Sequence, residues 1–483
     1  MAHRMTRRSL LAGAGGVLTA LSARSVRGAE AGSSVTAKLS EYMGAAGTRP
    51  LPQEAAEKTK QHILDTFAAM VSGCDLPPAQ VALKFARAHA GEKVATVVVW
   101  GELCGPIEAA MVNGMLAHSD ETDDSHAPSQ SHPGCAVVPA AFAAGEQFDI
   151  DGTRFVRAVA LGYDVGGRVG MTLGALPWQM ATHHSTHSIC GTFGAAAAAG
   201  CAASLNAQQM RWVLDYAAQQ AAGVAAWQRD TDHIEKSLVF AGMPARDGLS
   251  AALIIQLGGT GVEDIFSGAD NFLLTFSPKA DPAGLIDRLG ERYEIARTNI
   301  KKWTVGSPVQ APLDAIENLR KKRPFEAADV QKVIVRVATS EAKTVNNREM
   351  PDISLQHLVA VMLIDKTVTF RAAHDKPRMQ DPAVLRERAK VELVPDEELE
   401  KLVPLREGVV ELTLKSGEKL TERVSAVRGT AENPMTRDEV VAKCRDLMSP
   451  VLGAARCSQL IERILNLENL KSVRELRPLL KRA

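Results

Sequence analysis

The sequence predicts a mainly α-helical fold, in which a large all-helical domain is interrupted by a smaller inserted α+β domain. Between Glu54 and about Asn271, alanine, leucine, methionine and glutamine dominate, and apolar residues recur every three to four positions, as in packed helices. After about Thr298 the pattern changes to alternating segments rich in β-branched residues, which favour strands. Helical periodicity returns from Arg437 to the end of the chain.

The large domain is expected to begin with a helix soon after Pro52. Glu54 and Glu57 would fall in its first turn, where negative charge suits the helix dipole, and the pattern continues to Met70. Residues 191–205 (GTFGAAAAAGCAASL) are mostly small, which predicts a helix buried closely against its neighbours. This segment has no G-x-G-x-x-G after a predicted strand, so a dinucleotide site is not supported.

The inserted domain is expected to combine strands with a buried helix. Residues 330–337 (VQKVIVRV) alternate and predict a strand. Residues 408–414, the Ser416–Gly417 turn and residues 420–424 predict a hairpin, and residues 354–366 predict a buried helix between them. The expected domain bounds are 34–297 for the helical domain, 298–436 for the α+β domain and 437–483 for the C-terminal helical return.

Residues 1–31 resemble a twin-arginine export signal. Arg7 and Arg8 precede an apolar run from Leu10 to Leu21, and small residues follow near position 30, where a signal peptidase would cut. The run is too short to be a stable membrane anchor. We therefore expect a protein that folds in the cytoplasm, works in the periplasm and has no membrane association after signal cleavage.

Composition narrows the classes of function. Basic and acidic residues both number 56 and aromatic residues make up 4%, so the chain lacks the basic stripe and stacking platforms of a nucleic-acid binder. No two of the seven cysteines form a C-x-x-C pair, which disfavours an iron–sulfur or zinc-ribbon site. The cysteines are expected to be small buried hydrophobes.

Histidines and charges gather in four places. Seven of the twelve histidines lie between positions 118 and 233. The first group, residues 118–126 (HSDETDDSH) followed by His132, holds four carboxylates within five residues, a density that is costly unless the charges are solvated, paired or used. The second group contains His184 and His187, just before the small-residue helix. Lys236 and the Lys301–Lys302 pair complete the set.

Two kinds of chemistry compete for these residues. A divalent metal would suit the imidazoles and carboxylates, but no H-E-x-x-H spacing is present, and His184 stands where that motif between His183 and His187 would need glutamate. The alternative, which we favour, is acid–base chemistry without metal or cofactor. Lysines would hold a substrate carboxylate while histidine and acidic groups move protons.

At these residues the chain resembles the MmgE/PrpD family, which includes 2-methylcitrate dehydratase and cis-aconitate decarboxylase. The resemblance covers almost everything after residue 31. It is carried by six separated motifs: Asn113-Gly114, Glu121-Thr-Asp-Asp-Ser125, His132-Pro-Gly134, Gly191-Thr-Phe-Gly194, Lys236 with Gly242, and Ser354-Leu-Gln-His357. The family fold, a large helical domain with a smaller α+β lid and an active site between them, agrees with the fold expected from the patterns.

The resemblance implies roles for individual residues. It assigns catalysis to His132, His184, Glu121, Asp124 and Lys236, and substrate binding to Ser125, Lys301, Lys302, His187 and His357. The register leaves two choices open, His184 against His187 and Lys301 against Lys302. Three departures imply a substrate pocket different from that of the better-known relatives: Glu121 replaces a common aspartate, Gln310 stands where relatives have histidine, and His357 replaces a tyrosine.

The expected function is a lyase of the dehydratase type acting on a small polycarboxylate or hydroxy acid. His132 would transfer the proton, because an imidazole works in either direction near neutral pH. An epimerase or isomerase using the same proton abstraction is the alternative within enzymes, and a periplasmic carboxylate-binding protein is the alternative outside them. The resemblance also implies a homodimer.

Overall fold

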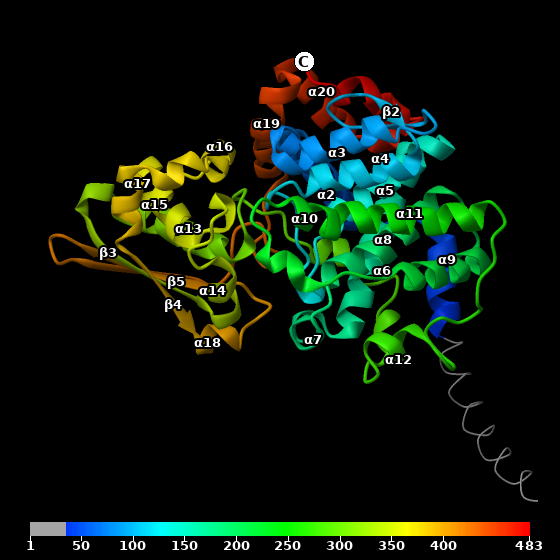
Figure 1. Cartoon of the computed structure of the whole chain (residues 1–483), viewed down its shortest axis with the longest axis horizontal. Coiled ribbons are helices and arrows are strands. Elements are labelled where there is room, and N and C mark those ends of the chain that lie inside the picture. The colour runs from blue at the N-terminus through cyan, green and yellow to red at the C-terminus, as the bar shows by residue number, and fades with distance from the viewer. Residues whose placement is uncertain (1–34) are drawn as a thin grey trace, which may run out of the picture.

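A computed structural model describes residues 35–483, and the mainly α-helical fold is confirmed. The buried apolar residues form two clusters. One draws on residues 35–300 and again on 435–480, and the other on residues 303–427. The chain thus builds a larger helical body, leaves it for a smaller α+β body beside it, and returns (Figure 1). The predicted export signal, residues 1–31, lies outside the described residues.

Helices account for nearly all of the larger body. Residues 35–45 are helical. The elements that follow are α2 (Gln53–Ser72), α3 (Pro77–Ala88), α4 (Pro106–Ala117), α5 (Pro133–Phe148), α6 (Gly152–Leu173), α7 (Ala175–Thr182), α8 (Thr186–Ala202), α9 (Ala207–Gln220), α10 (Ile234–Ser237), α11 (Met243–Gln256), α12 (Phe272–Phe276), α19 (Arg437–Leu452) and α20 (Ala454–Leu465). A small ribbon pairs β1 (Ala95–Thr96) with β2 (Leu103–Cys104).

Helix α8 lies at the centre of this body, as its small residues predict. Every one of its residues is buried, and it packs between α6 and α11. The approach is closest at glycines: a Cβ added to Gly248 of α11 would lie 2.5 Å from the backbone nitrogen of Ala196. Small residues therefore bring the three helices together at a distance that larger side chains would prevent.

One described helical run, Ile234–Gln256, is long and apolar enough by composition to cross a membrane. More than half of it is buried inside the larger body, where α11 packs on α8. Its apolar character is accounted for by this burial in the core. The run is interrupted by a π-helical turn, η4 (Leu238–Gly242), which affects the candidate site described below.

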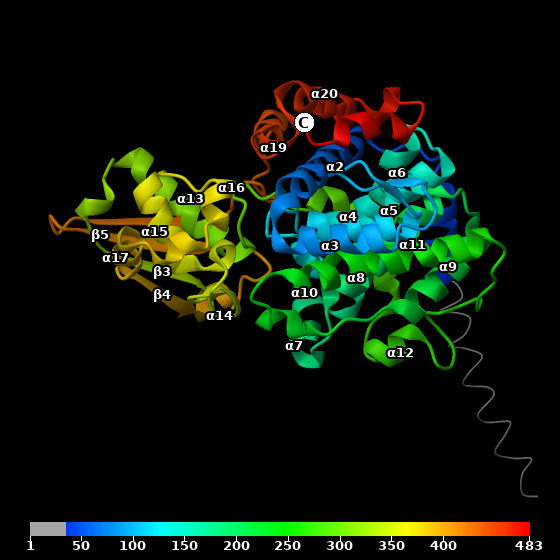
Figure 2. The same cartoon turned by 45° about the horizontal axis from the view of Figure 1, so that its top comes forward.

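The smaller body is built on a four-stranded sheet in the order β4-β3-β5-β6. The strands are β3 (Val330–Ala338), β4 (Val391–Asp396), β5 (Gly408–Leu414) and β6 (Lys419–Val424), and the helices are α13 (Ser307–Lys322), α14 (Thr339–Val345), α15 (Leu355–Asp365), α16 (Phe370–His374), α17 (Pro382–Arg388) and α18 (Glu397–Glu400). Helices α13 and α15 pack on the sheet, as Figure 2 shows. The predicted strand, hairpin and buried helix are all present.

Strand β4 was not predicted. It pairs parallel with β3, and its sequence, VELVPD, has half-exposed side chains and a proline. Proline is tolerated because β4 is an edge strand, where one row of backbone groups needs no partner. The burial pattern of β4 does not alternate regularly, so the sequence gives no clear strand signal.

Candidate active site

The loop between α4 and α5, residues 118–132, is buried and not a solvated turn. His118 ends α4 and His132 precedes α5. All four carboxylates in the loop are at most 4% exposed: Asp120, Glu121, Asp123 and Asp124. Buried carboxylates require charged or hydrogen-bonding partners, and each of these has them.

Asp123 lies at the centre of the loop and contacts two imidazoles. One carboxylate oxygen is 3.0 Å from His118 Nδ1 and the other is 3.2 Å from His132 Nδ1. Lys301 Nζ lies 3.8 Å from the second oxygen. Burial alone would raise the pKa of Asp123, but these imidazoles hold it well below its usual range. Asp123 therefore stays ionised and orients both rings.

Glu121 is paired with two lysines that come from distant parts of the chain. Its carboxylate forms an ion pair with Lys236 of α10. Lys301 Nζ lies 3.5 Å from the other carboxylate oxygen and donates to the Glu121 backbone carbonyl at 2.8 Å. Burial raises the pKa of Glu121, yet the two ammonium groups outweigh it and hold the pKa well below its usual range.

Three imidazoles gather around Phe240, which lies in the π-helical turn η4, and a fourth, that of His233, lies beside His118. The ring centroids of His118 and His132 are 5.1 Å apart, those of His132 and His187 are 5.2 Å apart, and those of His118 and His233 are 5.1 Å apart. Phe240 stacks on His187 at 3.8 Å and on His118 at 4.7 Å. Such π-turns occur often at functional sites, and this one places an aromatic ring among the imidazoles.

His132 is the most accessible ring of this imidazole cluster (His118, His132, His187 and His233). Its exposed fraction is 8%, against 4% for His187 and His233 and none for His118. Burial lowers the pKa of His132, and the Asp123 carboxylate only partly offsets that effect. A neutral imidazole held through Nδ1 can accept a proton at Nε2, so His132 is suited to act as a base.

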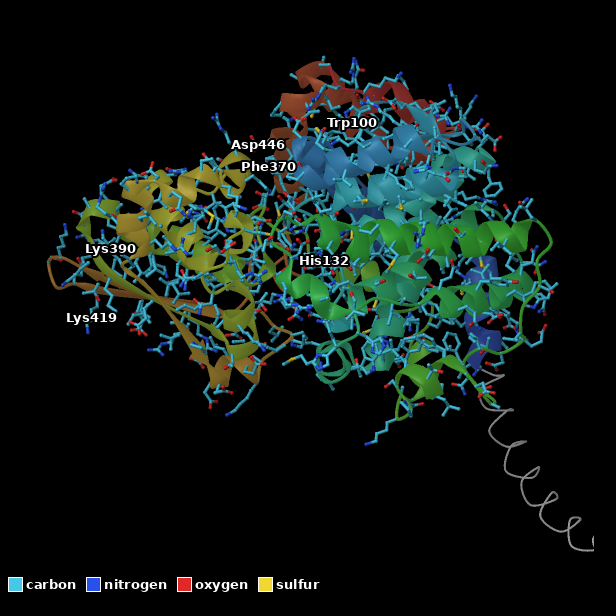
Figure 3. The ribbon with its side chains drawn as sticks, in the orientation of Figure 1. Trp100, His132, Phe370, Lys390, Lys419 and Asp446 are labelled. Atoms are coloured by element: carbon cyan, nitrogen blue, oxygen red, sulfur yellow. The ribbon has the colours of Figure 1, made fainter. Side chains whose placement is uncertain are left out.

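The smaller body contributes to the same region. His374 Nε2 lies 2.8 Å from a carboxylate oxygen of Asp120. Burial opposes the charge on His374, but Asp120 raises its pKa to about 9. Asp352 is buried, which raises its pKa to about 6, and the charges acting on it include Glu121 and Lys236. Figure 3 labels His132 near the junction of the two bodies.

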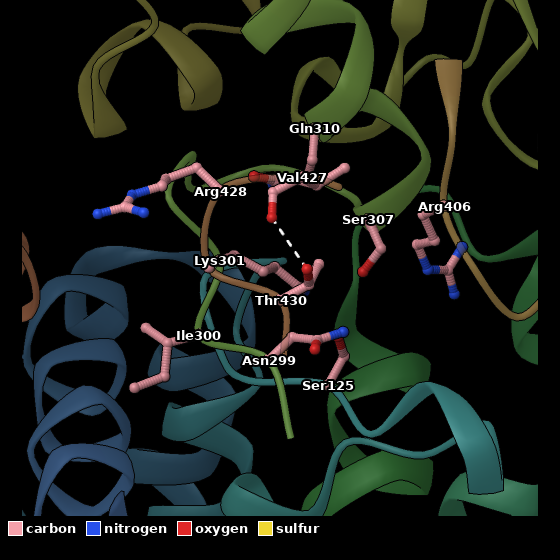
Figure 4. A pocket seen from close by; sticks show the side chains of 11 residues that line it. Ser125, Asn299, Ile300, Lys301, Ser307, Gln310, Arg406, Val427, Arg428 and Thr430 are labelled. Atoms are coloured by element: carbon pink, nitrogen blue, oxygen red, sulfur yellow. Dashed lines mark hydrogen bonds between the residues drawn. The ribbon is translucent and has the colours of Figure 1, made fainter. Parts of the chain in front are cut away.

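A pocket with about 270 Å³ of empty space opens beside Lys301, between the loop and the smaller body (Figure 4). Its arginines are already paired: Arg406 lies 2.6 Å from Glu341, and Arg428 forms an ion pair with Glu439. The pocket is lined by Ser125, Asn299, Ile300, Lys301, Ser307, Gln310, Arg406, Val427, Arg428, Gly429 and Thr430.

Comparison with known proteins gives the family. The MmgE/PrpD N-terminal domain matches residues 37–284, and the MmgE/PrpD C-terminal domain matches residues 303–467. The chain belongs to the MmgE/PrpD family. It is 27% identical over 457 residues to cis-aconitate decarboxylase of Homo sapiens, covering 89% of this chain and 91% of the relative. It is 24% identical over 482 residues to cis-aconitate decarboxylase of Aspergillus terreus, covering 93% and 96%.

A third relative, cis-aconitate decarboxylase-like protein oryM of Aspergillus oryzae, is 24% identical over 469 residues, covering 92% of this chain and 96% of the relative. Matches of this extent span both bodies of the fold. Membership of the MmgE/PrpD family and relatives of this kind support an enzyme of the lyase type.

The structure places the two histidines and the two lysines of the open registers differently. His187 contacts His132 and Phe240, whereas His184 stacks on Trp178 at 5.2 Å and meets Phe276. The structure therefore places His187, not His184, in contact with His132, because the chain turns at His183, whose φ is 62°, and helix α8 begins only at Thr186.

The lysine register is decided in the same way. Lys301 points to Glu121, while Lys302 lies over Trp303 and pairs with Glu317 at 2.7 Å. Of the two lysines, only Lys301 contacts the loop. The prediction that Lys302 binds substrate does not fit this placement.

Asp124 and His357 also lie apart from the imidazole cluster. The Asp124 carboxylate accepts from Tyr163 and from the backbone nitrogen of Gly134, and it lies 2.7 Å from His62 Nδ1. Its oxygens are engaged by these partners, away from the imidazole cluster, and its catalytic role stays a prediction. The charges acting on His357 come from Arg388, Arg378 and Asp375 of the smaller body, and its substrate contact stays a prediction.

Apart from the metal alternative, sequence reasoning assigned no individual role to five residues at the candidate site: His118, Asp123, His233, Asp352 and His374. His118 and Asp123 belong to the acidic motif, and the rule that a buried carboxylate needs a partner would have paired them. His233 is one of the seven clustered histidines. Asp352 and His374 carried no local signal, because they reach the site only through the packing of the smaller body.

Proposed function

We propose that this MmgE/PrpD protein is a lyase that removes a proton next to a carboxylate of a small hydroxy acid or polycarboxylate and then expels hydroxide. The observation that carries the proposal is the Asp123–His132 pair beside two buried lysines. A neutral, oriented imidazole next to cationic groups is the arrangement that carbanion-forming chemistry requires.

In the proposed reaction, the C–H bond breaks and its proton moves to Nε2 of His132. The electron pair delocalises toward the substrate carboxylate, whose growing charge is stabilised by the Lys236 and Lys301 ammonium groups. The C–O bond then breaks as an alkene forms, and the hydroxide leaves as water after taking a proton from a neighbouring acid. The ammonium group of Lys236, which pairs with Glu121, is the proposed acid.

Dehydration is favoured over the decarboxylation named for the relatives by the environment of Gln310. Its side chain donates to the backbone carbonyls of Trp303 and Val305 and accepts from the Trp303 nitrogen. It braces this loop and does not supply the proton-transfer group that the resemblance expects there. The substrate pocket therefore differs from that of a decarboxylase at this position.

The test is a thermal-shift screen of the purified protein with di- and tricarboxylates and hydroxy acids, followed by mass spectrometry of each stabilising compound after incubation in deuterated water. Loss of water from a compound supports the proposal. Deuterium incorporation without an alkene would support an epimerase, and a ligand recovered unchanged would support a binding protein.

The variant His132→Ala should lose turnover of the compound identified in this way, while His184→Ala keeps it, because only His132 is held by Asp123. Full turnover by His132→Ala would contradict the proposed role. The proposal that the protein is exported and works as a homodimer is independent of this test.

A further inference from the structure

His233 is a buried histidine with no hydrogen-bond partner for either ring nitrogen among residues 35–483. It lies just before α10 with φ 67°, a backbone conformation that residues other than glycine rarely adopt. Buried polar atoms in native proteins almost always have partners. An imidazole held in this conformation with both nitrogens unsatisfied indicates that a ligand belongs beside it.

The nearest neighbours of His233 offer further ligand atoms. The His118 ring lies 5.1 Å away between centroids, and its Nε2 is likewise buried and unpartnered within the described part of the chain. The Glu121 carboxylate completes the group. One ligand atom each from His118, Glu121 and His233 all lie within 4.8 Å of one another.

We propose that His118, Glu121 and His233 bind one divalent transition-metal cation of the zinc class. Two imidazoles and one carboxylate form a common ligand set for such ions, and a fourth position remains open for water or a substrate carboxylate. The second nitrogen of His118 is held by Asp123 at 3.0 Å. A carboxylate behind a metal-binding histidine fixes the ring so that its free nitrogen faces the ion.

The local charges support a bound cation. Four carboxylates meet in this region, from Asp120, Glu121, Asp123 and Asp352, whereas two lysines, Lys236 and Lys301, face them. The His374 imidazole lies beside Asp120 at 2.8 Å. The negative charge that Lys236, Lys301 and His374 leave unbalanced must be balanced by protons on the other imidazoles or by a cation. A cation would also bind an unsatisfied nitrogen of His233.

Lys236 competes with the proposed ion, because its ammonium group already pairs with Glu121. The rings of Trp227 and Phe240 lie 5.6 and 5.2 Å from Lys236 Nζ, within the range in which an aromatic face attracts a cation. Lys236 can therefore move toward these rings when the ion takes its place. Local motif spacing, which favoured a metal-free site, could not reveal a site shared by His118 and His233, because these two residues are far apart in the sequence.

The inference does not rest on the proposed lyase activity, because binding is measured without substrate. Purified full chain is stripped with EDTA, dialysed against Zn²⁺ or Co²⁺, and assayed by elemental analysis, with Co²⁺ absorption in the visible range as a second readout. We expect about one equivalent per chain, and a Co²⁺ spectrum typical of low coordination number.

His233→Gln should weaken metal affinity by at least about 100-fold, and so should His118→Gln, which serves if the first variant does not fold. His184→Gln is the matched control and should bind as the wild type does, because His184 lies outside the imidazole cluster. Lys236→Met should tighten binding, because it removes the competing ammonium group. Far-UV circular dichroism of the metal-free variants verifies folding.

Two results would overturn the proposal: less than about a fifth of an equivalent bound by the folded wild type, or affinity that His233→Gln and His118→Gln leave unchanged. Either result would mean that protons, not a cation, balance the carboxylates. Failure of the lyase assay alone would not affect the inference, and loss of metal binding alone would not exclude proton transfer by His132.

Discussion

Replacing Asp123 with asparagine tests the proposed roles of the site most directly. The carboxylate accepts from two imidazoles, at 3.0 Å from His118 Nδ1 and 3.2 Å from His132 Nδ1. Asparagine keeps the shape but offers one acceptor oxygen and one NH₂ donor. At least one imidazole must then lose its acceptor or turn to the other tautomer.

The magnitude follows from the hydrogen bond to His132. A hydrogen bond to a charged group contributes about 1.5–3 kcal/mol, so its loss alone lowers kcat/KM roughly 10- to 150-fold. If the amide locks His132 in the wrong tautomer, the loss rises toward about 10⁴-fold. We therefore expect a reduction between these limits on the substrate found by the ligand screen.

The pH profile of kcat/KM gives a second readout. Burial lowers the pKa of His132 and Asp123 raises it, so removing the carboxylate lowers it further. The base must be neutral to act, and activity therefore falls as pH drops through this pKa. In Asp123→Asn the acidic limb of the profile should move to lower pH while the plateau falls.

Asp164→Asn is the matched control. Asp164 is also a buried carboxylate of the larger body, hydrogen-bonded to Tyr42 and paired with Arg168. Its replacement should reduce stability and leave the acidic limb in place. If Asp123→Asn retains kcat/KM within about threefold of the wild type, the proposal that Asp123 orients the base fails.

Other properties can be tested without a substrate. The pKa of His374 is raised to about 9, so its pair with Asp120 stabilises the fold fully below the unfolded histidine pKa of about 6.5. This stabilisation is lost as pH rises toward 9. The melting temperature of His374→Gln should therefore lack this decrease when it is measured across the same pH range. Gly248→Ala should destabilise the protein, by about 1–3 kcal/mol in denaturant melts, because the new Cβ meets α8 backbone; a gain in stability would contradict that packing. Changing Arg7 and Arg8 to lysine should leave the uncleaved chain in the cytosol on fractionation, whereas continued export would exclude a twin-arginine signal.

The fold was predictable because each body repeats a simple pattern over many residues. In the helical body, apolar residues recur with a sustained period of 3.6 residues, and the small side chains of residues 191–205 predict close packing. Strand β3 and the β5–β6 hairpin alternate strongly, because one face of the sheet is buried. Strand β4 has half-exposed side chains without regular alternation and contains a proline, so its pattern was too weak to identify.

The candidate site was predictable only in part, because its pairings join residues far apart in the sequence. A family motif places His132 and Glu121, but neither motif nor spacing distinguishes His187 from His184, which differ only in where a short turn ends and α8 begins. The π-helical turn that brings Phe240 among the imidazoles has no sequence signature comparable to that of a regular helix.

The rule that buried carboxylates need charged or hydrogen-bonding partners could have predicted more of the site than motif comparison did. Four carboxylates within five residues, between two strongly apolar helices, must be buried together and must therefore find cations or donors elsewhere. Lys236 and Lys301, the lysines that face Glu121, are 115 and 180 positions away. The rule predicts that such partners exist but not which lysines they are, because that choice depends on how distant segments pack: Lys236 lies in α10 of the larger body, and Lys301 lies where the chain leaves it. The junction of the two bodies contributes Lys301 and His374 to the partners of the loop, so variants that loosen this junction should affect activity even when every residue of the loop is intact.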